Sequence, residues 1–222
     1  MSLVVAIDGP SGSGKSTVAR GVADSLGFDV LDTGAMYRAV TLAALDRGID
    51  LNDADACAGI ASDTELDVGD RVMLDGHDVT TAIRGPTVTT AVSQVSAHPA
   101  VRRELVKRQR AWIAAREGGV VEGRDIGTVV FPDATVKIFL TASDEERAHR
   151  RQRDERAADR AVKVDDVKED LARRDREDSN RKASPLRSAP DAVVIDTTGR
   201  VVADVVDEIV RLVAAATTPN DR

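Results

Sequence analysis

Short apolar runs alternate with helix-spaced apolar positions along most of the chain, and this alternation predicts a parallel α/β sheet. The first predicted strand covers residues 3–8, a short β-branched run that reads as fully buried. The others cover residues 27–32, 119–122, 135–140 and 191–196. Helices are expected between them, and right-handed crossovers would place those helices on both faces of a doubly wound sheet.

The first two strands each lead into a predicted helix. One helix covers residues 17–23, and the next, capped by Asp32 or Thr33, continues through Leu45. Residues 87–96 are rich in Thr, Val and Ser, so this segment stays ambiguous between a strand and the start of a helix.

Pro99 suits the first turn of a helix that ends near Glu117. The apolar residues that can share its buried side are Val101, Leu105, Trp112 and Ile113. The basic residues expected to face elsewhere are Arg102, Arg103, Lys107, Arg108 and Arg110. The final helix is predicted to bury one side in the same way, with Val202, Val205, Val206, Ile209 and Val213. Residues 217–222 are expected to form a frayed tail.

Two segments depart from the alternating pattern. Residues 64–80 turn like a β-hairpin followed by a further short strand, which indicates a small antiparallel insert. Residues 144–182 are dense in both signs of charge, and Ser143 with Glu146 predicts a capping box at their start. Two solvated helices joined by a tip near residues 157–162 are the default interpretation. The sharper interpretation is a mobile, arginine-bearing flap that closes over phosphates.

Residues 9–16 read Gly-Pro-Ser-Gly-Ser-Gly-Lys-Ser, which is a complete phosphate loop between a buried strand and a helix. Its glycines let backbone N–H groups turn inward around an anion, and the following helix adds the positive end of its dipole. Lys15 is expected to reach the β- and γ-phosphates, and the Ser16 hydroxyl to bind Mg²⁺. The residues expected to bind ATP are Gly9, Pro10, Ser11, Gly12, Ser13, Gly14, Lys15, Ser16 and Thr17.

Composition narrows the possible partners. The net charge of −7 argues against a general nucleic-acid or anionic-membrane surface, so a polyanionic substrate would need local arginines. The single cysteine, Cys57, excludes an internal disulfide and is predicted to be a buried small residue. No apolar run reaches the roughly 20 residues of a membrane span. We therefore expect a cytoplasmic monomer that binds neither nucleic acid nor membrane.

Arginines follow several predicted strands, and open α/β sheets bind ligands at those strand ends. Arg38 lies in the opening turns of a helix, where its spacing alone fits a surface arginine equally well, and Arg124-Asp125 lies between two glycines. A triphosphate loop with many arginines indicates phosphoryl transfer. A phosphate acceptor is largely ionised near neutral pH, so arginine clamps suffice without a general base. A kinase must also exclude water, which gives the charged flap a role as a lid.

The motifs resemble those of bacterial cytidylate kinases, the CMP/dCMP kinases among the nucleoside monophosphate kinases. Beside the phosphate loop, the resemblance rests on residues 31–38, 92–95, 123–134 and 173–181. Gly-Arg-Asp-Ile-Gly-Thr-Val-Val-Phe-Pro, which begins at Gly123, is far more specific than the phosphate loop. The resemblance covers nearly the whole chain. It implies a single P-loop kinase domain over residues 1–222, with a monophosphate-binding insert at about 62–92 and a helical lid at about 147–164.

The resemblance also implies an acceptor site. Its CMP-binding residues are Thr33, Arg38, Ser93, Arg102, Arg124, Asp125, Arg174, Asp178 and Arg181. Ser93, Arg102 and Asp125 match the residues that read cytosine, and a uracil oxygen would leave their acceptors unpaired. Arg38, Arg124 and Arg181 match the clamp on the acceptor phosphate. Asp178, with Arg174 nearby, matches the position that holds the ribose hydroxyls, and Thr33 keeps the hydroxyl of the Ser that relatives often have there.

The resemblance leaves open which of Arg150, Arg151 and Arg153 reaches the transferred phosphoryl group. The catalytic candidates are Lys15, Arg124, Arg150, Arg153 and Arg181. We therefore expect Mg²⁺-dependent transfer of the ATP γ-phosphoryl group to CMP or dCMP. A kinase of the same architecture that acts on UMP, AMP or shikimate is one alternative, against which the cytosine-reading set argues. A non-catalytic nucleotide-sensing module is the other, and it would lack the acceptor residues.

Overall fold

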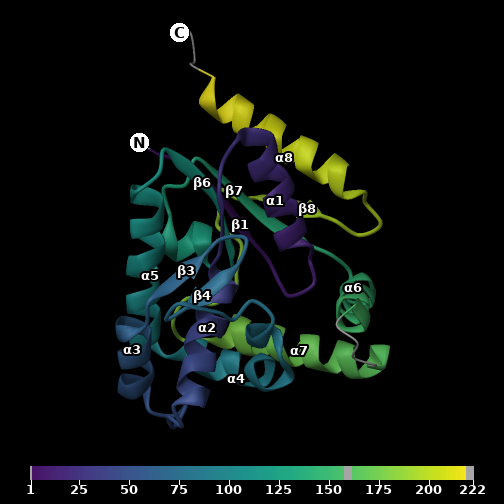
Figure 1. The fold of residues 1–222 in the computed structure, drawn as a ribbon. Coiled ribbons are helices and arrows are strands. Elements are labelled where there is room, and N and C mark those ends of the chain that lie inside the picture. Colours follow the sequence, from purple (N-terminus) through teal and green to yellow (C-terminus); the bar gives the residue numbers. More distant parts are fainter. Residues whose placement is uncertain (1, 158–161, 219–222) are drawn as a thin grey trace.

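The structure is a computed structural model that describes residues 2–157 and 162–218 (Figure 1). Its central sheet contains β1 (Leu3–Asp8), β2 (Val30–Asp32), β6 (Gly118–Gly123), β7 (Val136–Thr141) and β8 (Val193–Asp196). The strand order is β2-β6-β1-β7-β8, and all four pairings are parallel. The predicted parallel sheet is confirmed, although β2 begins three residues later than expected.

Side chains of β1 alternate between two cores, as the two-residue period of a strand requires. Val5 and Ile7 pack with buried residues of α1 (Lys15–Leu26) and α8 (Val202–Thr217). Val4 and Ala6 pack with buried residues of α2 (Thr33–Asp46) and α5 (Pro99–Ala114). Figure 1 shows the two helix layers on opposite sides of the sheet. The sheet is therefore doubly wound, as predicted.

The predicted insert is a second sheet. It consists of the antiparallel strands β3 (Leu66–Val68), β4 (Val72–Leu74) and β5 (His77–Asp78). The preceding helix α3 (Ala54–Asp63) was not predicted, and it holds Cys57 fully buried, as expected of this residue. The carboxylate of Asp53 caps α3 by accepting the N–H groups of Asp55 and Ala56.

The ambiguous segment 87–96 is helical. A short 3₁₀ turn, η1 (Ala82–Arg84), leads into α4 (Pro86–Ala97). Pro86 occupies the first turn, and Val88, Val92 and Val95 are buried at spacings of four and three residues. That spacing is helical, so packing of one helix face outweighs the strand preference of Val and Thr.

The charged segment forms α6 (Asp144–Ala157) and α7 (Val164–Asn180). Their shared core is small and consists of Ala148, Val167 and Leu171. Ser143 accepts the N–H of Glu146 at 3.2 Å, but the Glu146 carboxylate pairs with Arg150, so half of the predicted capping box forms. Most of the predicted tip, residues 158–161, lies outside the described residues, as do residues 219–222 of the predicted tail.

Three predicted positions were wrong. α5 ends at Ala114, because the carbonyl of Glu117 already accepts the N–H of Leu3 beside the sheet. Arg102 is 5% exposed, since it shares a helical stripe with the buried residues Leu105 and Gln109. Val202 is 44% exposed at the first position of α8.

Among the described residues, no helix is long and apolar enough to cross a membrane.

Candidate active site

A cleft of about 640 Å³ opens at the carboxyl ends of the central strands, where α/β sheets bind ligands. Ser11 to Thr17 line it, whereas Gly9 and Pro10 of the predicted ATP site lie at the base of the loop outside this lining. All nine predicted CMP-binding residues and all five catalytic candidates line it. The fold thus brings residues from six elements to one site.

The phosphate loop packs tightly against the sheet. A Cβ at Gly9 would lie 2.1 Å from the carbonyl oxygen of Leu140, and the φ of Gly9 is +150°, so glycine alone fits. The Lys15 ammonium group donates to the carbonyl of Pro10 at 2.7 Å. Because α1 begins at Lys15, its positive dipole end faces the cleft.

The carboxylates of Glu122, which is buried, and of Asp32, which is half-buried, lie beside Lys15. Asp32 and Glu122 are in register at the ends of the paired strands β2 and β6. Burial and the charge of Arg124 lower the pKa of Lys15, while burial and the charge of Asp32 raise the pKa of Glu122. The Ser16 hydroxyl lies close to Glu122 and acts against the rise of that pKa. A negative charge placed beside Lys15 and Glu122 would therefore change the pKa values of both groups.

We expect ATP binding at pH 8 to be accompanied by net proton uptake. A bound triphosphate places negative charge next to Lys15 and Glu122, which raises the pKa of both groups. Titration calorimetry at pH 8 in two buffers of different ionisation enthalpy measures the number of protons. Lys15→Met is expected to lose most of this uptake, and net proton release by the unaltered protein would contradict the prediction.

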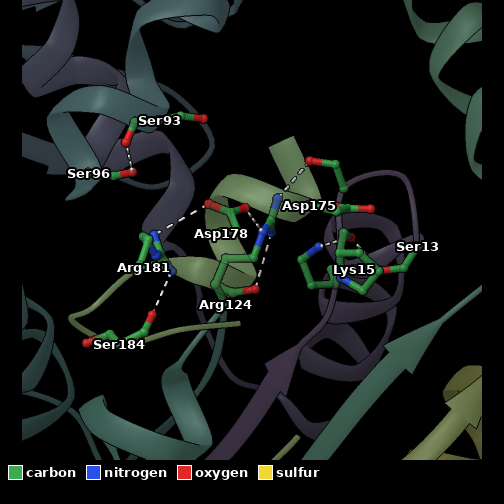
Figure 2. A network of polar contacts seen from close by, with 12 residues as sticks. Ser13, Lys15, Ser93, Ser96, Arg124, Asp175, Asp178, Arg181 and Ser184 are labelled. Carbon is green, nitrogen blue, oxygen red and sulfur yellow. Dashed lines mark hydrogen bonds and ion pairs between the residues drawn. The ribbon is translucent and has the colours of Figure 1, made fainter. Parts of the chain in front are cut away.

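Arg124 joins the phosphate loop to α7. Its Nη2 donates to Ser11 Oγ at 2.8 Å, and its Nε donates to Asp178 Oδ2 at 3.0 Å (Figure 2). Arg181 Nη1 lies 3.5 Å from the other oxygen of Asp178. Burial acts to raise the pKa of Asp178, but the charges of Arg124 and Arg181 outweigh it and hold this pKa below its usual value. One carboxylate therefore orients two guanidinium groups.

Two further arginines, the half-buried Arg38 and the buried Arg174, lie close to other positive charges. Arg38 donates to the carbonyl of Ile83 at 3.1 Å and to Thr89 Oγ1 at 2.9 Å. Arg174 is 8% exposed, and its Nε has no hydrogen-bond partner in the described part of the chain. Burial and then the charge of Arg174 lower the pKa of Arg38 to about 9, and burial and then Arg124 lower that of Arg174. A bound polyanion would relieve this repulsion.

The predicted base-reading residues line one part of the cleft. Arg102 and Asp125 form an ion pair in which each side chain is 6% exposed. The Arg102 guanidinium also lies 5.3 Å from the ring centroid of Tyr37, within the range of a cation–π contact. Ser93 lies on α4, where its carbonyl oxygen accepts the hydroxyl of Ser96 at 3.1 Å (Figure 2).

The two catalytic candidates on α6 differ in position. Arg150 pairs with Glu146 at 2.8 Å and donates to the side chain and carbonyl of Thr197 at 2.9 and 2.8 Å. It also lies next to Gly14 of the phosphate loop. The side chain of Arg153 is 69% exposed and lies 3.8 Å from the Glu146 carboxylate. Arg150 is thus already at the phosphate loop, whereas Arg153 lies at the rim.

Sequence reasoning missed several residues of the site. Thr197 follows β8, lines the cleft and donates to the carbonyl of Ser13 at 3.1 Å. Its position directly after a strand was the available signal. Arg147 donates to the carbonyl of Ser11 at 3.1 Å and pairs with Asp175 of α7, which fastens the start of α6 to the loop. Further residues of the lining that were not predicted include Tyr37, Arg84, Glu122, Arg200 and Val201.

Known proteins and one protein family resemble this chain over most of its length. The family model for cytidylate kinase matches residues 5–215. The cytidylate kinase of Mycobacterium avium (strain 104) is 54% identical over 216 residues, which cover 95% of each chain. The bifunctional pantoate ligase/cytidylate kinase of Synechococcus sp. (strain JA-3-3Ab) is 54% identical over 218 residues. That match covers 94% of this chain, which spans only 40% of the Synechococcus protein.

A solved gluconokinase from Sinorhizobium meliloti 1021 has a TM-score of 0.51 at 15% identity, covering 96% of this chain and 92% of its own. This likeness shows the fold alone, which is that of a P-loop kinase. The matched residues 5–215 include the phosphate loop and every predicted acceptor residue in the cleft. On these grounds, and as its motifs predict, the chain belongs to the cytidylate kinase family.

Proposed function

We propose that the protein transfers the γ-phosphoryl group of ATP to CMP or dCMP, giving ADP and CDP or dCDP. One observation carries this proposal: in a chain of the cytidylate kinase family, Arg124 links a phosphate loop to a cluster of buried arginines within one cleft. The loop suits the donor triphosphate, and the arginines suit a second phosphate group.

The donor is held by residues 9–17, with backbone N–H groups around the phosphates and Lys15 at the β- and γ-phosphates. Mg²⁺ suits this end of the cleft, because it prefers one or two protein oxygens together with substrate phosphates. Ser16 supplies a hydroxyl oxygen there, beside the Glu122 carboxylate. When bound, the ion would neutralise phosphate charge. A Mg²⁺ titration of Ser16→Ala against the unaltered protein tests the role of Ser16.

The acceptor nucleotide is bound at its phosphate, its ribose and its base by different residues. Arg38, Arg124 and Arg181 clamp the phosphate, while Asp178, with Arg174 nearby, holds the ribose side. Thr33 also lines the cleft. At the base, Ser93 and Asp125 accept from the exocyclic amine of cytosine, and Arg102 donates to its ring acceptors. Uracil carries an oxygen in place of that amine and would leave both acceptors unpaired.

The chemical step needs positioning and charge neutralisation. An ionised oxygen of the acceptor phosphate attacks the γ-phosphorus, and the bond between that phosphorus and the β,γ-bridging oxygen breaks to release ADP. Lys15, Arg124 and Arg181 stabilise the negative charge that spreads over the transferred group. Arg150 and Arg153, on the proposed lid at about 147–164, add positive charge around the transferred group, and the lid excludes water.

The remaining sequence predictions fit this assignment. We propose that residues 62–92 act as the monophosphate-binding insert of a single domain. Arg38 supports this role, because it donates to Ile83 and Thr89 within the insert. The monomeric state, the cytoplasmic location and the lack of nucleic-acid binding stay predictions.

The proposal is tested by a coupled ADP-release assay with ATP, Mg²⁺ and one acceptor at a time: CMP, dCMP, UMP, AMP or shikimate. We expect the largest kcat/KM values for CMP or dCMP, and no turnover when a chelator removes Mg²⁺. Turnover of AMP but not CMP would favour a kinase with another acceptor. ATP binding without turnover of any acceptor would favour a nucleotide sensor.

A further inference from the structure

Asp8 is a buried carboxylate to which the mechanism above gives no role. It is the last residue of β1, directly before the phosphate loop, and it is 4% exposed. Its Oδ1 accepts the backbone N–H of Ile126 and its Oδ2 accepts that of Gly127, both at 2.8 Å. One side chain thus fastens the end of β1 to the turn that follows β6.

These two N–H groups belong to the residues that directly follow Arg124 and Asp125 in the chain. Because β1 and β6 are in register, with Asp8 opposite Gly123, the segment that starts at Arg124 leaves β6 beside Asp8. From here the side chain of Arg124 runs to Ser11 and Asp178, and that of Asp125 runs to Arg102. The bond to Ile126 fixes the peptide unit on the carboxyl side of Asp125, and so the direction of its side chain.

Packing alone does not account for a carboxylate at this position. Burial raises the pKa of Asp8 to about 6, and the two backbone N–H groups act against that rise. The charged groups that face it are Asp125 and Lys15. An apolar side chain such as that of Ile7 would avoid the cost of burying a charge, but it could accept neither N–H. Asparagine offers one acceptor oxygen and turns an NH₂ group toward the other N–H.

We propose that Asp8 is a positioning residue for base recognition, which holds Asp125 in the direction that meets the exocyclic amine of cytosine. The inference rests on the proposed function, since it presumes a cytosine nucleotide as acceptor. Asp8 acts through the peptide units after Asp125 and does not contact the acceptor itself. Its loss should therefore weaken discrimination between bases as well as the overall rate.

The test compares Asp8→Asn with Ile7→Val, a control in the same strand that removes one buried methylene but no hydrogen-bond acceptor. For Asp8→Asn we expect kcat/KM for CMP to fall roughly 10-fold to 100-fold, as for other buried groups left without a partner. The ratio of kcat/KM for CMP to that for UMP should fall about 10-fold, because UMP gains less from Asp125. The KM for ATP should change less than about 2-fold. Ile7→Val should lose some stability and keep the ratio.

The outcomes separate this inference from the proposed function. If the unaltered protein does not phosphorylate CMP, the proposed function fails and this inference fails with it. If the unaltered protein prefers CMP but folded Asp8→Asn keeps the full CMP-to-UMP ratio, or Ile7→Val loses that ratio, the inference alone is overturned. Thermal denaturation reports whether each variant is folded.

Should Asp8→Asn not fold, the unaltered protein provides the decisive measurement. Protonation removes one of the two acceptors of Asp8, so the CMP-to-UMP ratio should fall as the pH is lowered from 8 to 5.5. The phosphate groups of CMP and UMP titrate alike, so their protonation cancels in the ratio. Protonation of Lys15 also cancels, because Lys15 binds the ATP donor in both reactions. A ratio independent of pH over this range would overturn the inference.

Discussion

Replacing Arg124 by alanine is expected to lower kcat by about 100-fold or more. Arg124 is the side chain that reaches both the phosphate loop, at Ser11, and the acceptor side of the cleft, at Asp178. Its loss removes a charge-assisted donor from the acceptor phosphate and frees Asp178 from one of its two arginines. The variant should therefore lose rate and also raise the KM for CMP.

Steady-state kinetics with CMP measures this effect, and thermal denaturation shows whether Arg124→Ala stays folded. Arg116→Ala is the matched control, because Arg116 stacks on Trp112 and pairs with Asp29 outside the cleft lining. It should stay within about 2-fold of the unaltered rate, as expected of a surface substitution. Arg124→Lys keeps the charge but loses the planar fork, so an intermediate rate is expected. Near-normal turnover by Arg124→Ala would remove Arg124 from the catalytic set.

The second large effect is expected at the buried pair of Arg102 and Asp125. Arg102→Met leaves the Asp125 carboxylate buried without its partner, and Asp125→Asn does the same to the Arg102 guanidinium. Each single change should lower the free energy of unfolding by about 3–5 kcal/mol. The double variant should lose less than the sum of the two, because no unpaired charge remains.

Urea denaturation of the four proteins gives the coupling free energy, and kinetics with CMP and UMP give the base preference. We expect all three variants to lose their preference for CMP, whatever stability the double variant regains. Strictly additive losses of stability would mean that the two charges are energetically independent. A double variant that still prefers CMP would mean that the base is read elsewhere.

Local signals in the sequence predicted the framework of the site well. The strand, loop and helix around residues 9–16, the parallel strands and the antiparallel insert are each defined by neighbouring residues, and this arrangement of elements is confirmed. The unpredicted α3 also carried a local signal, because Asp53 at its start is a good N-cap. Its interior is rich in small residues, so the periodicity of its apolar positions is weak.

The residues whose roles were missed depend on partners far along the chain. Helical spacing alone could have placed Arg102 beside the buried Leu105 and Gln109, but a buried guanidinium needs a partner, and that partner, Asp125, lies 23 residues later in the loop after β6. Asp8 was read as the end of a strand, and its partners are 118 and 119 residues away. Thr197 reaches Ser13 across 184 residues. Periodicity carries no information about such pairs, since the sheet order creates them.

The contacts of Arg147 restrict how the cleft can close. Its guanidinium group holds the carbonyl of Ser11 together with Asp175 of α7, so the root of α6 travels with the phosphate loop as one unit. In the proposed lid at about 147–164, the pivot must then lie beyond Arg147, and the outer half of α6, where Arg153 is exposed, would be the part that swings. Arg153 lies on that outer half, whereas Arg150 is held near the pivot by its hydrogen bond to Thr197. The two arginines would therefore reach the transferred group in sequence, the inner one first.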